Sequence, residues 1–155
     1  MNTIETKLNI LIDGLRKKEQ SLLEIVNITE NQGTVLESEL PQEQIQTFVA
    51  NMNMEKQAHI QDVIKCDNLF EKILNEIGKA LDKSPESYVE QVQTIQEGIK
   101  KVMDLDVKVR VLEEKNNRFV LSRREAEKLL ARQKRPKLAR DTSRLIDAYK
   151  KNTRD

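Results

Sequence analysis

Apolar residues recur at alternating steps of four and three positions along most of the stretch from residue 88 to residue 133. The positions in register are Tyr88, Val92, Ile95, Ile99, Val102, Val109, Leu112, Asn116, Phe119, Ala126, Leu130 and Gln133. On an α-helix this spacing keeps one narrow stripe facing a neighbouring helix, as in coiled-coil packing. The pattern therefore predicts a long helix that packs lengthwise against other helices.

Two earlier segments carry the same spacing. The first predicted helix covers residues 3–38, and Gly33 is interpreted as a sign of fraying near its end because glycine is a poor helix former. Pro41 ends this helix. It suits the first turn of the second predicted helix, over residues 42–81, since the N–H that proline lacks has no partner there.

The third predicted helix begins at two turn residues. Ser84 is the candidate N-cap and Pro85 the first helical residue, and Pro136 stops the helix. Connections this short make successive helices antiparallel. The predicted fold is therefore all-α, with three long antiparallel helices forming a coiled-coil hairpin or bundle over residues 1–135. The third helix is expected to be the longest and to overhang the others, and residues 136–155 are predicted to be a basic, flexible tail.

Composition and charge favour a helical protein that binds other proteins. Of the 155 residues, 34% are charged and 3% aromatic, which suits seams between helices better than a thick core. Residues 1–114 carry 13 Lys and Arg against 21 Asp and Glu, whereas residues 115–155 carry 14 against 5. The formal net charge of +1 thus combines an acidic body with a basic end. A protein of this kind usually functions by binding another protein chain.

The sequence offers little for catalysis or metal binding. His59 and Cys66 are the single His and the single Cys, whereas a structural zinc site needs about four ligands. Paired acids such as Asp104 and Asp106 lack a desolvated pocket that would separate their pKa values. No phosphate-binding loop or nucleophile motif is present. We therefore expect no enzyme activity, no metal and no cofactor.

Several features bear on location and partners. A single Cys fits a reducing compartment, no apolar run approaches the roughly 20 residues of a membrane span, and the N-terminus lacks a signal-peptide pattern. We therefore expect a cytoplasmic protein without membrane insertion. The basic end could bind nucleic acid through phosphates. It lacks interleaved aromatic residues and adjoins an acidic body, so a protein partner is the preferred interpretation.

The stripes contain polar interruptions, among them Thr29 and Asn116. A polar residue in a seam can fix the register of the helices at some cost in stability. It can also loosen the packing so that a foreign helix enters. Both interpretations remain open, and the second gains weight at Asn116 because the expected overhang begins just beyond it.

Three stretches resemble the FlgN family of flagellar type III export chaperones, particularly its clostridial members. They are residues 15–25 (LRKKEQSLLEI), residues 66–73 (CDNLFEKI) and residues 109–117 (VRVLEEKNN). The last is similar to the family pattern of an apolar residue, a Glu and an Asn before the cargo-binding end. A departure is Asn68, where similar proteins often have Gly. The resemblance covers most of residues 1–134.

The resemblance implies a non-catalytic chaperone. Such proteins bind amphipathic C-terminal helices of hook–filament junction proteins, prevent their premature assembly and deliver them to the export gate. The alternative function is a structural coiled-coil adaptor or an export-ATPase regulator that acts by oligomerising, and the sequence leaves monomer and dimer open. The expected cargo contacts are apolar residues, one register-setting amide and two steering cations: Val109, Leu112, Phe119, Val120 and Leu130; Asn116; and Arg123 and Arg124.

Overall fold

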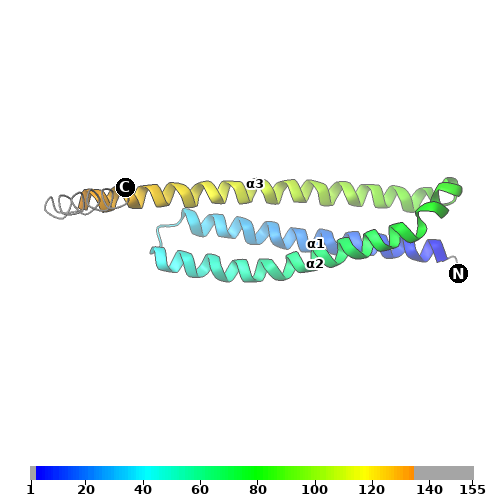
Figure 1. Cartoon of the computed structure of the whole chain (residues 1–155), viewed down its shortest axis with the longest axis horizontal. Coiled ribbons are helices and arrows are strands. Elements are labelled where there is room, and N and C mark those ends of the chain that lie inside the picture. The colour runs from blue at the N-terminus through cyan, green and yellow to red at the C-terminus, as the bar shows by residue number, and fades with distance from the viewer. Residues whose placement is uncertain (1–2, 135–155) are drawn as a thin grey trace, which may run out of the picture. The chain divides into compact units, whose positions relative to one another are not determined.

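The computed structural model describes residues 3–134, which form three α-helices and one short 3₁₀ helix (Figure 1). No strand occurs in this described range. With 46 residues, α3 is the longest helix. The predicted all-α fold with three long helices is confirmed, whereas the predicted tail lies outside the described residues. The elements in chain order are α1 (Thr3–Glu37), α2 (Gln42–Lys83), η1 (Pro85–Tyr88) and α3 (Val89–Lys134).

The chain divides into two units, Met1–Asn117 and Arg118–Asp155. The first unit contains α1, α2, η1 and the N-terminal part of α3, and these elements form a helical bundle. Within the described residues, the second unit consists of the C-terminal part of α3.

Ion pairs between α1 and α2 show that these two helices are antiparallel (Figure 1). Lys7 pairs with Glu76 at 2.9 Å, and Lys18 pairs with Asp67 at 2.7 Å. The position on α2 falls as the position on α1 rises. The short connection around Pro41 therefore has the effect expected from the sequence.

Within the first unit, α3 runs parallel to α1. Glu30 pairs with Lys108 at 3.7 Å, and Glu37 pairs with Lys115 at 3.8 Å. Here the position on α3 rises together with the position on α1. The bundle is therefore an up-down-up arrangement in which successive helices are antiparallel.

The core of the bundle is a line of aliphatic side chains along the seams between the helices. Leu8 and Leu11 on α1 and Ile77 on α2 are at most 2% exposed. Burying such a side chain contributes about 1.5–3 kcal/mol, so the seams hold the bundle together. The main core cluster occupies positions that the four-three spacing predicts: Leu8, Leu11, Leu15, Leu22, Ile25, Ile73, Ile77, Ile95 and Val102. Val26 and Ile28 are also buried, although they lie outside that register.

The helix ends differ in detail from the prediction. Pro41 is the N-cap of α2 and not its first helical residue, and its carbonyl accepts the N–H of Ile45 at 3.1 Å. Ser84 makes no side-chain capping hydrogen bond. Ser84 is the N-cap residue and Pro85 the first helical residue, as predicted, but the helix that they begin is η1, which leads directly into α3. With φ −140° and ψ 61°, Ser84 lies outside the extended conformation in which an N-cap hydroxyl reaches the first turn.

Candidate functional site

The predicted cargo contacts fall into both units, and three of them belong to the bundle. Val109 packs against the core, Leu112 is half-buried, and Asn116 is only 6% exposed. Val109 and Asn116 therefore already contact helices of their own chain. A cargo helix that used these two side chains would have to replace contacts made inside the bundle.

The side chain of Asn116 joins α3 to α1. Its Nδ2 donates a hydrogen bond to the backbone carbonyl of Thr29 at 3.0 Å. Its Oδ1 lies 2.9 Å from the position that a Cβ on Gly33 would take. Gly33 lies inside α1, which continues to Glu37, and glycine at this position leaves room for the buried amide.

A second polar contact joins all three helices, and we call its residues the polar layer: Gln32 on α1, Asn53 and Lys56 on α2, and Glu113 on α3. Lys56 is 5% exposed. Its Nζ donates to Gln32 Oε1 at 2.5 Å and pairs with Glu113 Oε1 at 2.5 Å. Gln32 Nε2 donates to Asn53 Oδ1 at 2.6 Å. Burying an ammonium group is costly unless it is paired, so the polar layer fixes how the three helices align.

Lys56 is not among the functional residues predicted from the sequence, although its position carries a signal. Lys56 falls in the four-three register of α2 between Met52 and His59. A charged residue is not expected in a register that apolar residues define. The buried lysine becomes visible only when its partners on α1 and α3 are known.

In the second unit, the C-terminal part of α3 carries a largely exposed apolar stripe. Positions 119, 126 and 130 share one face because seven and eleven residues are close to about two and three helical turns. Leu129 and Leu130 are 57% and 53% exposed, Ala126 is exposed and Phe119 is half-buried. We call Phe119, Ala126, Leu129 and Leu130 the terminal stripe.

Of the remaining predicted contacts, Val120 and Arg123 flank the terminal stripe, whereas Arg124 lies on the opposite side of the helix. Val120 and Arg123 are half-buried, and Arg124 is exposed. Lys128 and Arg132, also exposed, lie with Arg124 on the opposite side of the helix by the helical period. The C-terminal part of α3 thus combines an apolar face with a basic face.

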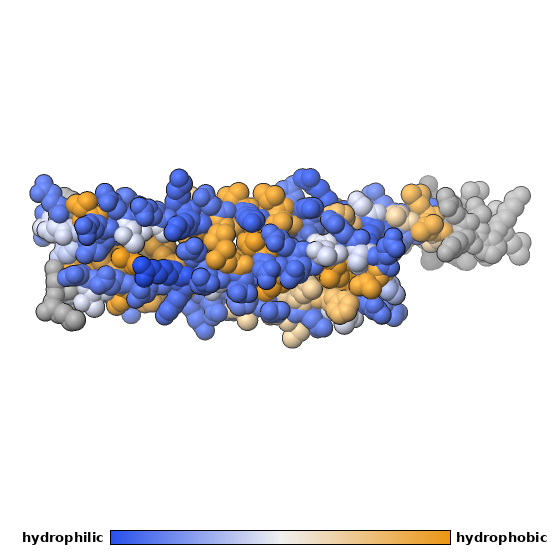
Figure 2. Space-filling model, turned by 180° about the vertical axis from the view of Figure 1, so that it is seen from behind, coloured by the Kyte–Doolittle hydropathy of each residue, from blue (hydrophilic) through white to orange (hydrophobic). Residues whose placement is uncertain are grey.

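The bundle also exposes apolar side chains that the sequence analysis did not single out. Met103, Val107 and Val111 follow one another at steps of four on α3 and are 60%, 57% and 60% exposed. Figure 2 shows one face of the molecule, on which charged residues break the apolar surface into patches. The three residues form a short apolar row on the outer side of α3.

The described residues offer limited chemistry. No group of three or more His, Cys, Asp or Glu side chains in this part of the chain is placed to hold a metal ion. Burial raises the pKa of the Cys66 thiol, and the neighbouring Asp67 acts in the same direction. Among the helices of the described range, none combines the length and the apolar character that crossing a membrane requires.

Comparisons of the chain with models of protein families, with curated proteins and with solved structures found no match. A functional assignment therefore depends on the residues and geometry described above.

Proposed function

We propose that this protein is a flagellar type III export chaperone. It binds the amphipathic C-terminal helices of hook–filament junction proteins in the cytoplasm, prevents their premature assembly and brings them to the export gate, and it has no catalytic role. The three stretches that resemble the FlgN family support this proposal. The observation that carries it is the terminal stripe, an apolar helix face that remains largely exposed at the end of a long helix.

The chemistry of the terminal stripe suits an amphipathic helix as cargo. Such a helix lays its apolar face on a complementary apolar surface. Covering the exposed parts of Leu129 and Leu130 removes apolar area from water, which contributes about 25 cal/mol per Å². The basic face with Arg124, Lys128 and Arg132 favours cargo with acidic residues, mainly by speeding the encounter.

The buried position of Asn116 refines which predicted contacts belong to the proposed site. Since its amide is bonded to Thr29, we assign Asn116 and Val109 to holding α3 in the bundle. The proposed cargo contacts are then Phe119, Val120 and Leu130, together with the two steering arginines. Leu112, which is half-buried, lies between Val109 and Asn116 in the part of α3 that belongs to the bundle.

The experiment measures the affinity of the full chain for a labelled peptide that corresponds to the C-terminal helix of a junction protein. The double substitution Leu129→Ser, Leu130→Ser should weaken binding by about ten- to a hundredfold, because each such side chain is worth about 1.5–3 kcal/mol when fully covered and 1.4 kcal/mol is one decade. Thermal melting should remain nearly unchanged, since both side chains are more than half exposed.

Val107→Ser, Val111→Ser is the matched control. These two residues are also exposed and also on α3, but they lie outside the terminal stripe. This variant should bind the peptide like the unsubstituted chain. Equal affinity of the terminal-stripe variant and the control would refute the proposed site, and absence of binding by the unsubstituted chain would refute the proposed cargo.

The alternative, an adaptor or export-ATPase regulator that acts by oligomerising, is favoured by the apolar row Met103, Val107 and Val111. In that case the row is covered by a second copy. Sedimentation would then show a stable oligomer that Val107→Ser, Val111→Ser dissociates, whereas the chaperone proposal expects this variant to sediment like the unsubstituted chain.

A further inference from the structure

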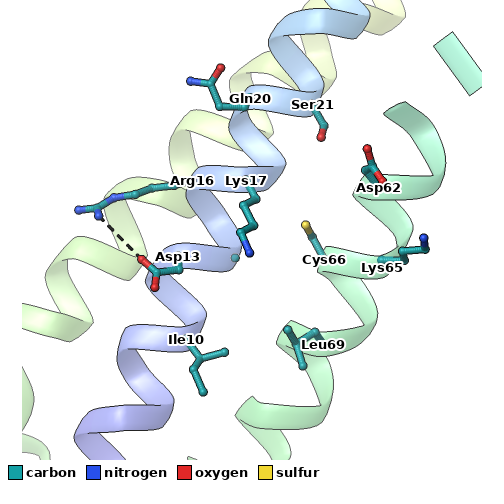
Figure 3. Close-up of a pocket in the computed structure, with 11 residues that line it drawn as sticks. Ile10, Asp13, Arg16, Lys17, Gln20, Ser21, Asp62, Lys65, Cys66 and Leu69 are labelled. Carbon is teal, nitrogen blue, oxygen red and sulfur yellow. Dashed lines mark ion pairs between the residues drawn. The ribbon is translucent and has the colours of Figure 1, made fainter. Parts of the chain in front are cut away.

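Helices α1 and α2 leave a groove between them on a side that no residue of α3 lines. The groove has a volume of about 700 Å³. Gly14 of α1 is among the residues that line it. Cys66 of α2 lies between the two helices, and Ile10 and Leu69 border the groove (Figure 3). Nothing lies within 4 Å of the position that a Cβ on Gly14 would take. The groove exists because glycine stands where a larger side chain could fill the seam.

Two apolar side chains of the groove, one from each helix, are partly exposed. Ile10 is 39% exposed and Leu69 is 45% exposed. A smaller hollow of about 230 Å³, between Gly14 and Cys66 on one side and Ile99 and Met103 of α3 on the other, lies behind the same seam. The seam between α1 and α2 is therefore thinly packed at this level, and a side chain from outside would find space and apolar contacts.

Two lysines that line the groove have no acidic partner among the described residues. Arg16 and Asp13 pair with each other at 3.9 Å. The Lys17 side chain points into the groove between the two helices (Figure 3). Neither Lys17 nor Lys65 makes a hydrogen bond or ion pair with an acid among the described residues. With Asp62 as the other acid, the groove has an excess of positive charge, although residues 1–114 as a whole are acidic.

We infer that the α1–α2 groove binds an acidic amphipathic helix of a partner protein. Its apolar side chains would fill the space above Gly14 and cover Ile10 and Leu69, and an Asp or Glu beside them would pair with Lys17. Two long helices with an open seam form the kind of surface on which a further helix packs lengthwise. The bound helix would complete a four-helix arrangement. This site is separate from the terminal stripe and does not depend on the proposed export function.

Binding at the groove can be measured through the reactivity of the single cysteine. Cys66 is the only Cys in the chain and lies between the two helices that line the groove (Figure 3). A bound helix should cover its thiol and slow alkylation by iodoacetamide. Because burial raises the pKa of this thiol, the reaction is followed at alkaline pH, where the thiolate forms.

The probe is a synthetic helical peptide of about 18 residues, long enough for about five turns, with Leu along one face and Glu beside it. A second peptide has Lys in place of each Glu. The acidic peptide should slow alkylation of Cys66 in the full chain by at least about tenfold at saturation, whereas the basic peptide should leave the rate unchanged, as charge complementarity requires. Equal protection by both peptides, or by neither, would overturn the inference.

Gly14→Leu tests whether binding needs the open space beside Gly14. The leucine side chain would occupy the groove, so binding of the acidic peptide should weaken by at least about tenfold. The matched control is Gly78→Leu, since Gly78 is a helical glycine that also has nothing within 4 Å of its Cβ position but lies outside the groove. Undiminished binding by a folded Gly14→Leu variant would contradict the inference.

Lys17→Glu tests whether the positive charge of Lys17 contributes to binding. Because Lys17 is exposed, this variant should fold even if Gly14→Leu does not. The variant should bind the acidic peptide more weakly and the basic peptide more tightly. An unchanged preference would overturn the inference. The terminal-stripe variant Leu129→Ser, Leu130→Ser should still show full protection of Cys66, so failure of the export proposal and failure of this site are distinguishable.

Discussion

Gly33→Ala tests whether the close approach of α1 and α3 depends on the missing side chain. At an open helical position, replacing Gly by Ala stabilises a protein by about 1 kcal/mol. At Gly33 the new Cβ would lie 2.9 Å from Oδ1 of Asn116, which is closer than real Cβ atoms approach other heavy atoms. The substitution therefore forces the Asn116 side chain to move.

The magnitude follows from what that movement breaks. Asn116 is 6% exposed, and its amide donates to the Thr29 carbonyl at 3.0 Å. Losing such a bond and leaving a buried polar group unpaired costs about 1–3 kcal/mol. Gly78→Ala, in open space, is the matched control. Gly33→Ala should therefore be less stable than Gly78→Ala by about 1–3 kcal/mol.

The assay is reversible urea unfolding followed by circular dichroism, and a double-mutant cycle makes it specific. In an Asn116→Ala background the obstructing amide is gone, so Gly33→Ala should become stabilising by about 1 kcal/mol, like any open glycine. The proposed conflict between a Cβ at position 33 and the Asn116 amide is refuted if Gly33→Ala stabilises the otherwise unsubstituted chain as much as Gly78→Ala does. It is also refuted if the Asn116→Ala background leaves the effect of Gly33→Ala unchanged.

Three further predictions concern the bundle. Glu113→Ala should lower the free energy of unfolding in denaturant by about 1–3 kcal/mol, because it leaves the buried Lys56 ammonium without its counter-charge. Lys56→Met removes that charge and should cost less. The reverse order would contradict the role of the polar layer. Leu8→Ala should cost about 2–5 kcal/mol, and a calorimetric loss well below that range would mean that the seam is not tightly packed. The hydrogen bond from Lys7 lowers the pKa of the Glu76 carboxyl. This pair therefore stabilises the fold above the ordinary pKa of Glu, and the contribution is lost as pH falls through the lowered pKa. Lys7→Met should raise the pKa of Glu76 in an NMR titration, and an unchanged pKa would disprove the pairing.

The sequence alone determined the helices and their inward faces. The four-three spacing placed Leu8, Leu11 and Ile77 in the core, and the structure buries all three. Pro41 marked the connection between the first two helices to within a residue. These features are local, because helical periodicity and the missing N–H of proline act within a few residues along the chain.

The tertiary structure decided what the helices present to one another. Lys56 is buried because Gln32 and Glu113 meet it from two other helices. Gly33 leaves room for the amide of Asn116, whereas Gly14 opens a groove because nothing lies within 4 Å of its Cβ position. A spacing pattern shows which face of a helix turns inward. The distance between two faces, and the partners that a polar group finds there, depend on side chains far apart in the sequence, so they appear only once the helices are packed.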